Sequence, residues 1–196
     1  MNYIFALLLS VSLTAQAADL PDPKLSPGQA YQVSPKLLCT PNYTSGYVDL
    51  QGNWYAKGQP RPDDAVPVRN VKALTEKAVW AEYGVQNYQG YCRTDSKYVP
   101  GTNTLKDEKD PDEGCEIDHI ISLILSGSNN KENLWPQTYN TEFKWNAHRK
   151  DVLEVKLHKM VCAGKIDITE AQHAISTDWR TAYIKYVDPS YAQYLK

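Results

Sequence analysis

Apolar side chains in the last third of the chain recur at the spacing of an α-helix, and this pattern limits the fold strongly. From Ile168 to Tyr186 the intervals between successive apolar positions are three, four, four, three and four residues. Asp167 and Glu170 have the form of a capping box, which predicts that a helix begins here. A preceding helix is predicted over about 142–161. Its apolar face comprises Leu153, Leu157, Met160 and Val161.

The first half of the chain is less regular and predicts shorter elements. Residues 37–54 mix aromatic and aliphatic side chains with Pro, Gly and Asn, as in irregular strands and turns. Residues 58–67 and the charged run 106–113 are predicted to be solvated loops. A helix is predicted over Asn70–Tyr83. Its apolar positions at helical spacing are Val71, Leu74, Ala78 and Ala81.

The first residues predict the compartment. Phe5–Leu13 is an apolar run too short to span a bilayer, and Thr14–Ala18 carries the small residues of a signal-peptidase site. We therefore predict a signal peptide over 1–17 and a secreted or periplasmic protein without membrane association after cleavage; the alternative is a short buried N-terminal element. Residues 18–35 are rich in Pro, Ser and Gly and predict a flexible leader. Residues 36–196 then form one domain.

Four cysteines in an exported chain predict two disulfide bonds rather than a zinc site, because no Cys-x-x-Cys pair is present. Four cysteines allow three connectivities, and the sequence does not choose among them. Cys92 and Cys115 bracket a polar segment with little core of its own, which a bridge would close. We predict this pair, which leaves Cys39 with Cys162.

The residues with the most chemical interest lie between the charged run and the two C-terminal helices. Cys115–Leu123 predicts a short strand that holds Asp118 and His119 side by side. A turn at 127–130 and a second short strand over 132–137 lead into the helix. This order predicts a ββα unit at about 115–162, in an α+β fold with further helices. A structural histidine oriented by its neighbouring carboxylate is the alternative interpretation of the Asp-His pair.

Five short motifs in this region resemble the HNH, or ββα-metal, endonuclease superfamily. The similarity is closest to a secreted and phage-borne bacterial subgroup, and it covers Cys115 to about Tyr186. It implies a metal-dependent endonuclease that cleaves DNA, or also RNA. The motifs are Glu-x-Asp-His at 116–119, Gly-x-x-Asn at 127–130, Asn-Leu-Trp-Pro-Gln at 133–137, Asn-Ala-x-x-Lys-Asp-x-Leu-Glu at 146–154 and Val-Cys-x-Gly at 161–164.

The chemistry of phosphodiester hydrolysis assigns roles to these residues. His119 is the expected general base, because a histidine can take a proton from water near neutral pH. Asp118 is an expected metal ligand, since hard cations prefer oxygen donors. The expected ion is Mg²⁺, with Mn²⁺, Ca²⁺ or Zn²⁺ as alternatives. Asn133 is expected to hold the loop that aims His119. No recognisable base-reading module is present, so little sequence preference is expected.

The helix ligand has two candidates, Asn146 and His148, which point to opposite sides of a helix. Leu153 marks the core face and Asn146 lies one heptad before it, so Asn146 is preferred. This argument requires that the helix begin before Asn146; otherwise His148 returns as the candidate.

Basic residues near the same helix, Arg149 and Lys150 among them, are candidates to hold the phosphate backbone, although an ordinary solvated helix face explains them equally well. Trp135 and Trp145 are expected in the core rather than stacked on bases. The formal net charge of −2 argues against a protein that coats nucleic acid. Two other functions stay open: a secreted nucleic-acid-binding or structural protein without turnover, and an antibacterial nuclease toxin. The sequence predicts no oligomeric state.

Overall fold

The structure is a computed structural model of the whole chain, and it describes residues 26–49, 51, 53–83, 97–98, 104–106, 115–139 and 143–195. The predicted signal peptide at 1–17 and most of the charged run at 106–113 lie outside these residues. Within the described ranges, no helix has the length and apolar character needed to cross a membrane.

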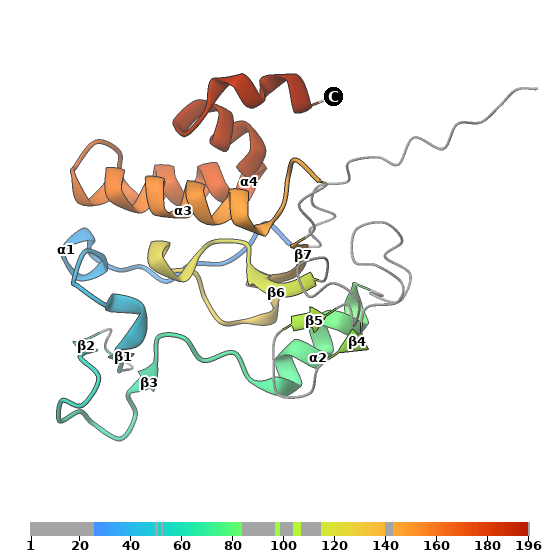
Figure 1. The fold of residues 1–196 in the computed structure, drawn as a ribbon. Coiled ribbons are helices and arrows are strands. Elements are labelled where there is room, and N and C mark those ends of the chain that lie inside the picture. The colour runs from blue at the N-terminus through green and yellow to red at the C-terminus, as the bar shows by residue number, and fades with distance from the viewer. Residues whose placement is uncertain are drawn as a thin grey trace, which may run out of the picture.

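The fold is mixed α and β, as predicted, and a four-stranded antiparallel sheet lies at its centre (Figure 1). Its strands pair in chain order, so each strand neighbours the next one along the sequence. The longest pairing aligns Ile117 with Pro136 and His119 with Leu134. The strands are β4 (Lys97–Tyr98), β5 (Thr104–Lys106), β6 (Cys115–His119) and β7 (Leu134–Thr138).

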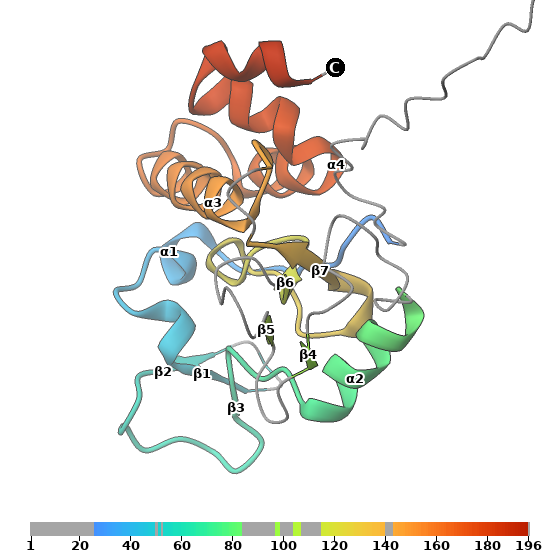
Figure 2. The same ribbon diagram turned by 45° about the vertical axis from the view of Figure 1, so that its right-hand side comes forward.

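Helices lie on two sides of the hairpin made by β6 and β7. Helices α3 (Ala147–Cys162) and α4 (Ile168–Tyr186) pack on each other and lie on one side, and α2 (Ala73–Glu82) contacts both strands from the other (Figures 1 and 2). The apolar core fills the space between these layers. It includes Val79, Ile117, Leu134, Leu153, Leu157, Ile175 and Trp179.

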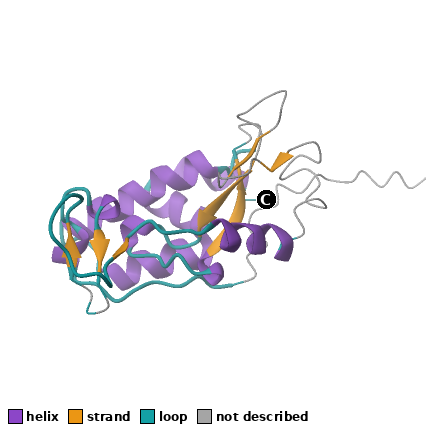
Figure 3. Cartoon of the chain, turned by 90° about the horizontal axis from the view of Figure 1, so that it is seen from below, coloured by secondary structure: helices purple, strands orange, loops and turns teal. Residues whose placement is uncertain are grey.

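Short elements make up the N-terminal part. Helix α1 (Pro35–Leu38) begins with Ser34, whose side chain caps it. A small antiparallel sheet follows in the order β2-β1-β3, and Figure 3 shows it as a group of strands separate from the central sheet. Its strands are β1 (Tyr47–Val48), β2 (Trp54–Tyr55) and β3 (Val66–Pro67).

Helix α4 follows the sequence prediction closely. Its N-cap is Asp167, whose carboxylate accepts a hydrogen bond from the backbone N–H of Glu170 at 2.6 Å. The Glu170 carboxylate accepts from the Tyr186 hydroxyl, and Asp178 interrupts the helical dihedrals midway.

Helix α3 begins later than predicted. It starts at Ala147 rather than near residue 142, because Asn146 has extended dihedrals and acts as the N-cap. The Asn146 side-chain oxygen accepts a hydrogen bond from the backbone N–H of Arg149. The preference for Asn146 over His148 required a helix that begins before Asn146. That argument therefore fails, and His148 is again a candidate ligand.

Helix α2 buries a different face from the predicted one. Leu74 is 82% exposed, and Ala78 and Ala81 are also exposed. Val79 and Trp80 are buried instead. Trp80 has the largest apolar surface among these side chains and gains the most free energy from burial, so the helix turns the face of Val79 and Trp80 inward at the expense of Leu74.

The predicted leader is not loose where the structure describes it. Ala30 forms a β-bridge with Gly127, and the backbone N–H of Tyr31 donates to the Ser126 carbonyl at 2.8 Å. The backbone N–H of Gln29 donates to the Asn133 side chain. The prediction of a flexible leader depended on the lack of an apolar period, and backbone hydrogen bonds leave no such pattern in the sequence.

The predicted disulfide between Cys39 and Cys162 is confirmed, with 5.6 Å between the two Cα atoms. It joins α1 to the end of α3. Cys115 is disulfide-bonded as well, but Cys92, its predicted partner, lies outside the described residues.

Candidate functional site

His119 and Asp118 stand at the end of β6, in the middle of the molecule. Successive side chains of a strand point to opposite faces, so the two lie on different sides of the sheet. The backbone N–H of His119 donates to Asp118 Oδ1 at 2.7 Å. His119 is only 4% exposed, whereas the Asp118 side chain is 17% exposed.

Asn129 fixes the tautomer of His119. The Asn129 amide nitrogen donates to the Val68 carbonyl at 2.7 Å, and its oxygen accepts from the backbone N–H of Asn70 at 3.2 Å. The orientation of the amide is therefore set, and its oxygen lies 3.2 Å from His119 Nε2. Because an amide oxygen only accepts hydrogen bonds, Nε2 must carry the proton. Nδ1 then holds the lone pair of the neutral ring.

Burial keeps this imidazole neutral. Loss of solvent lowers the pKa of His119 to about 4, and the neighbouring Asp118 carboxylate offsets only part of that effect. At neutral pH the ring is a proton acceptor, as a general base must be.

Lys150 connects Asp118 to α3. Its ammonium group is fully buried and contacts Asp118 Oδ2 at 2.6 Å, Glu154 Oε1 at 2.5 Å and the His119 carbonyl at 2.7 Å. Burial lowers the pKa of Lys150, but the Asp118 and Glu154 carboxylates outweigh burial and hold that pKa above its usual range. Ser122 donates to the second oxygen of Glu154 at 2.6 Å. The prediction that Lys150 binds phosphate is therefore wrong, because its charge faces the two carboxylates.

Asn133 ties together the loop that follows β6. It is fully buried, and its amide nitrogen donates to the carbonyls of Ile121 and Ser128, both at 2.9 Å. Its oxygen accepts from the backbone N–H groups of Ile121 and Gln29. These contacts hold the loop between the two strands, which is the position expected of Asn133.

Acidic side chains gather on the Asp118 face of the hairpin. Burial, and next the Asp118 charge, raise the pKa of Glu116 to about 8, and Tyr139 donates a hydrogen bond to it. Burial and the Asp118 charge also raise the pKa of Asp151. Gln137 pairs with Glu116 across the strands; it is fully buried, and neither its amide nitrogen nor its oxygen has a hydrogen-bond partner within the described chain.

The two candidate helix ligands lie differently. Asn146 is buried and lies one turn before Lys150, which binds Asp118, but its amide caps α3 and donates to the Phe143 carbonyl at 3.0 Å. His148 is exposed, and its ring centroid lies 5.5 Å from that of Tyr139.

The remaining predicted residues have simpler surroundings. Arg149 is exposed over the ring of Tyr191 and is available to a phosphate. Trp135 and Trp145 are buried, as expected. Trp145 donates to the Tyr194 carbonyl.

One compact group of metal-type ligands occurs among the described residues, and it lies at the disulfide. The ligand atoms of Cys39, His158 and Cys162 lie within 4.8 Å of one another and could hold a metal ion. Metal binding by cysteine requires thiolates, and the two sulfurs are bonded to each other here. The group is thus a ligand set only when the disulfide is reduced.

Sequence reasoning missed Asn129 and the ion pairs of Lys150. Asn129 lies inside the Gly-x-x-Asn motif at 127–130, but Asn130 rather than Asn129 is the residue that defines this motif. Lys150 had no local signal of burial, because Asp118 precedes it by 32 residues.

No protein-family model, curated protein or solved structure matches the chain.

Proposed function

We propose that this protein is a metal-dependent endonuclease of the HNH type, which hydrolyses phosphodiester bonds in DNA or RNA. The observation that carries the proposal is the state of His119: a neutral imidazole, buried, with its Nε2 proton held by Asn129. Asp118 directly precedes it on a β-hairpin followed by a helix, and its carboxylate accepts a hydrogen bond from the His119 backbone N–H.

In the proposed reaction His119 Nδ1 accepts the proton of the attacking water. Asn129 and Asn133 keep the ring and its loop in place while the proton moves. Lys150 orients the Asp118 carboxylate through its contact with Oδ2.

The donor set fits a hard divalent cation such as Mg²⁺. Burial, and next the Asp118 charge, raise the pKa values of Glu116 and Asp151, so carboxyl groups lie close together on this face and a cation there would favour their ionised forms. The orphaned amide of Gln137 adds a buried oxygen without a described partner. Asp118 would hold the ion, with Asn146 or His148 from α3. The bound ion would neutralise charge on the scissile phosphate and the leaving oxygen.

Secretion belongs to the same proposal. The Cys39–Cys162 disulfide fits an oxidising compartment such as the periplasm or the extracellular space. Phosphate contacts without base-reading contacts give little sequence preference, so cleavage of many sites is expected.

Conversion of supercoiled plasmid to nicked and linear forms tests the proposal. Purified protein should cleave with Mg²⁺ and stop with EDTA. His119→Ala should lower the rate by about 10²–10⁴-fold, the usual cost of losing a general base. His173→Ala is the matched control, because His173 is an exposed histidine on α4.

Two results would contradict the proposal. Cleavage by His119→Ala at the wild-type rate would show that His119 is not the general base. A gel shift of the plasmid by the wild-type protein, without any cleavage in Mg²⁺, Mn²⁺, Ca²⁺ or Zn²⁺, would favour the non-catalytic binding protein.

A further inference from the structure

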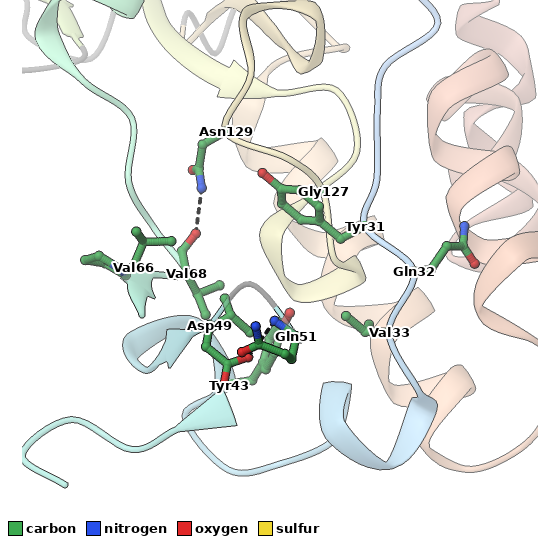
Figure 4. Close-up of a pocket in the computed structure, with 12 residues that line it drawn as sticks. Tyr31, Gln32, Val33, Tyr43, Asp49, Gln51, Val66, Val68, Gly127 and Asn129 are labelled. Atoms are coloured by element: carbon green, nitrogen blue, oxygen red, sulfur yellow. Dashed lines mark hydrogen bonds between the residues drawn. The ribbon is translucent and has the colours of Figure 1, made fainter. Parts of the chain in front are cut away.

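A cavity of about 450 Å³ lies beside the His119 site, between the N-terminal sheet and the loop after β6. Figure 4 shows Asn129 and Tyr31 toward one end of it and Tyr43, Asp49 and Gln51 toward the other. Its volume falls within the range of small-ligand sites in proteins, roughly 300–1,000 Å³.

The lining has the chemistry of a site for an uncharged, flat group. Tyrosine and valine side chains dominate it, and no lysine or arginine is among the lining residues that the structure describes. Asp49 is the one carboxylate, and its oxygens already accept hydrogen bonds from Asn53, Gln51 and Tyr55. A phosphate would meet this carboxylate without a cation to offset it, so an anionic group is disfavoured inside.

The cavity is joined to the site through Asn129. Asn129 lines the cavity and contacts His119, and Val68 lines the cavity and binds Asn129. Arg69 follows Val68 and is exposed. Arg69 also directly precedes Asn70, whose backbone N–H donates to Asn129, and no described carboxylate forms an ion pair with Arg69.

We propose that this cavity binds an unpaired nucleobase of the substrate, with Tyr31 as the stacking residue, while the adjoining phosphate lies against Arg69. The proposal rests on the proposed nuclease function and specifies its substrate: a single strand, since a base within a duplex must leave its stack to enter a cavity.

Tyr31 suits this role. The residue is 49% exposed and lines the cavity, and its backbone N–H is fixed to the Ser126 carbonyl. An aromatic ring stacks on any base, which agrees with little sequence preference.

Binding measured in EDTA tests the inference without turnover. The probes are fluorescent tetrathymidylate and a tetramer of abasic deoxyribose phosphates, which carries the same phosphates without bases. Wild-type protein should bind tetrathymidylate at least about tenfold more tightly, as expected for one stacked base. Tyr31→Ala should remove this difference, and Tyr31→Phe should keep it.

Further variants separate the two parts of the site. Val66→Trp, at an exposed edge of the cavity, should weaken tetrathymidylate but not the abasic probe. Arg69→Gln should weaken both probes. Tyr186→Ala, at a half-buried position of α4 outside the cavity lining, should change neither.

Equal affinity for the two probes, or an unchanged preference in both Tyr31→Ala and Val66→Trp, would overturn the inference. Plasmid cleavage together with equal affinities for the two probes would overturn this inference but leave the proposed nuclease function intact. A base-dependent preference without cleavage under any ion would instead overturn the proposed function and show a binding protein.

Discussion

The protonation state of single residues carries most of the functional argument. His119 is surrounded by groups that remove water from it and hold its Nε2 proton. The pKa of Glu116, three residues earlier, is shifted in the opposite direction, because burial and the Asp118 charge favour its protonated form. One short strand thus holds a neutral base and a neutral acid.

The pKa of His119 predicts how the stability of the chelated protein depends on pH. The folded-state pKa of about 4 lies below the ordinary histidine pKa of 6.5, so the unfolded chain binds the proton more readily. His119 therefore stabilises the fold above pH 6.5, and this contribution falls as the pH drops from 6.5 to 4. The loss amounts to about 3 kcal/mol.

Urea denaturation in EDTA between pH 4 and 8 measures this effect. Glu116 acts in the opposite direction between about pH 4.5 and 8, so the difference between wild type and His119→Ala is the informative quantity. That difference should shrink as the pH falls below 6.5. A difference independent of pH would contradict the buried neutral histidine.

At the level of elements, periodicity predicted what local sequence determines. Helix α4 and the β6–β7 hairpin follow from apolar spacing. Asp118, His119 and Asn133 border one loop, as the order of the motifs predicts, and their roles in a reaction stay predictions. The start of α3 was missed because Phe143 and Trp145 extend the apolar pattern beyond the cap at Asn146.

What the sequence could not predict depends on partners far along the chain. The burial of Lys150 makes sense only when Asp118 lies against α3, and the contacts of Asn129 require the segment of Val68 and Asn70. No local sequence pattern encodes either of these long-range contacts.

Lys150 links β6 to α3, and its removal predicts a large loss of stability. Lys150→Met would leave Asp118 and Glu154 buried without their cation, which typically costs about 3–5 kcal/mol. Chemical denaturation measures this loss. Lys156→Met, at an exposed position of α3, is the control and should change stability by less than about 0.5 kcal/mol. A Lys150 variant as stable as the control would mean that the ion pairs contribute nothing.

For the whole molecule, the Cys39–Cys162 disulfide joins residues 123 positions apart. It fastens α1 to the end of α3 and therefore encloses the central sheet and the candidate site within one covalent loop.

The double variant Cys39→Ala/Cys162→Ala should lower the free energy of unfolding by about 2–5 kcal/mol, since a long loop gains conformational entropy in the unfolded chain. Thermal denaturation of the oxidised wild type and the variant measures the difference. Identical melting temperatures would show that the disulfide does not contribute to the stability of the fold.

The bridge between Ala30 and Gly127 also bears on the order in which the molecule assembles. Contacts between neighbours in the chain form sooner than those that close long loops, so the β6–β7 hairpin and the α3–α4 pair should form early. The contact of Gln29 with Asn133 spans 104 residues and should form late. The first part of the described chain to be synthesised is then among the last to dock, and the loop beside His119 receives its final hydrogen bonds only when that segment arrives.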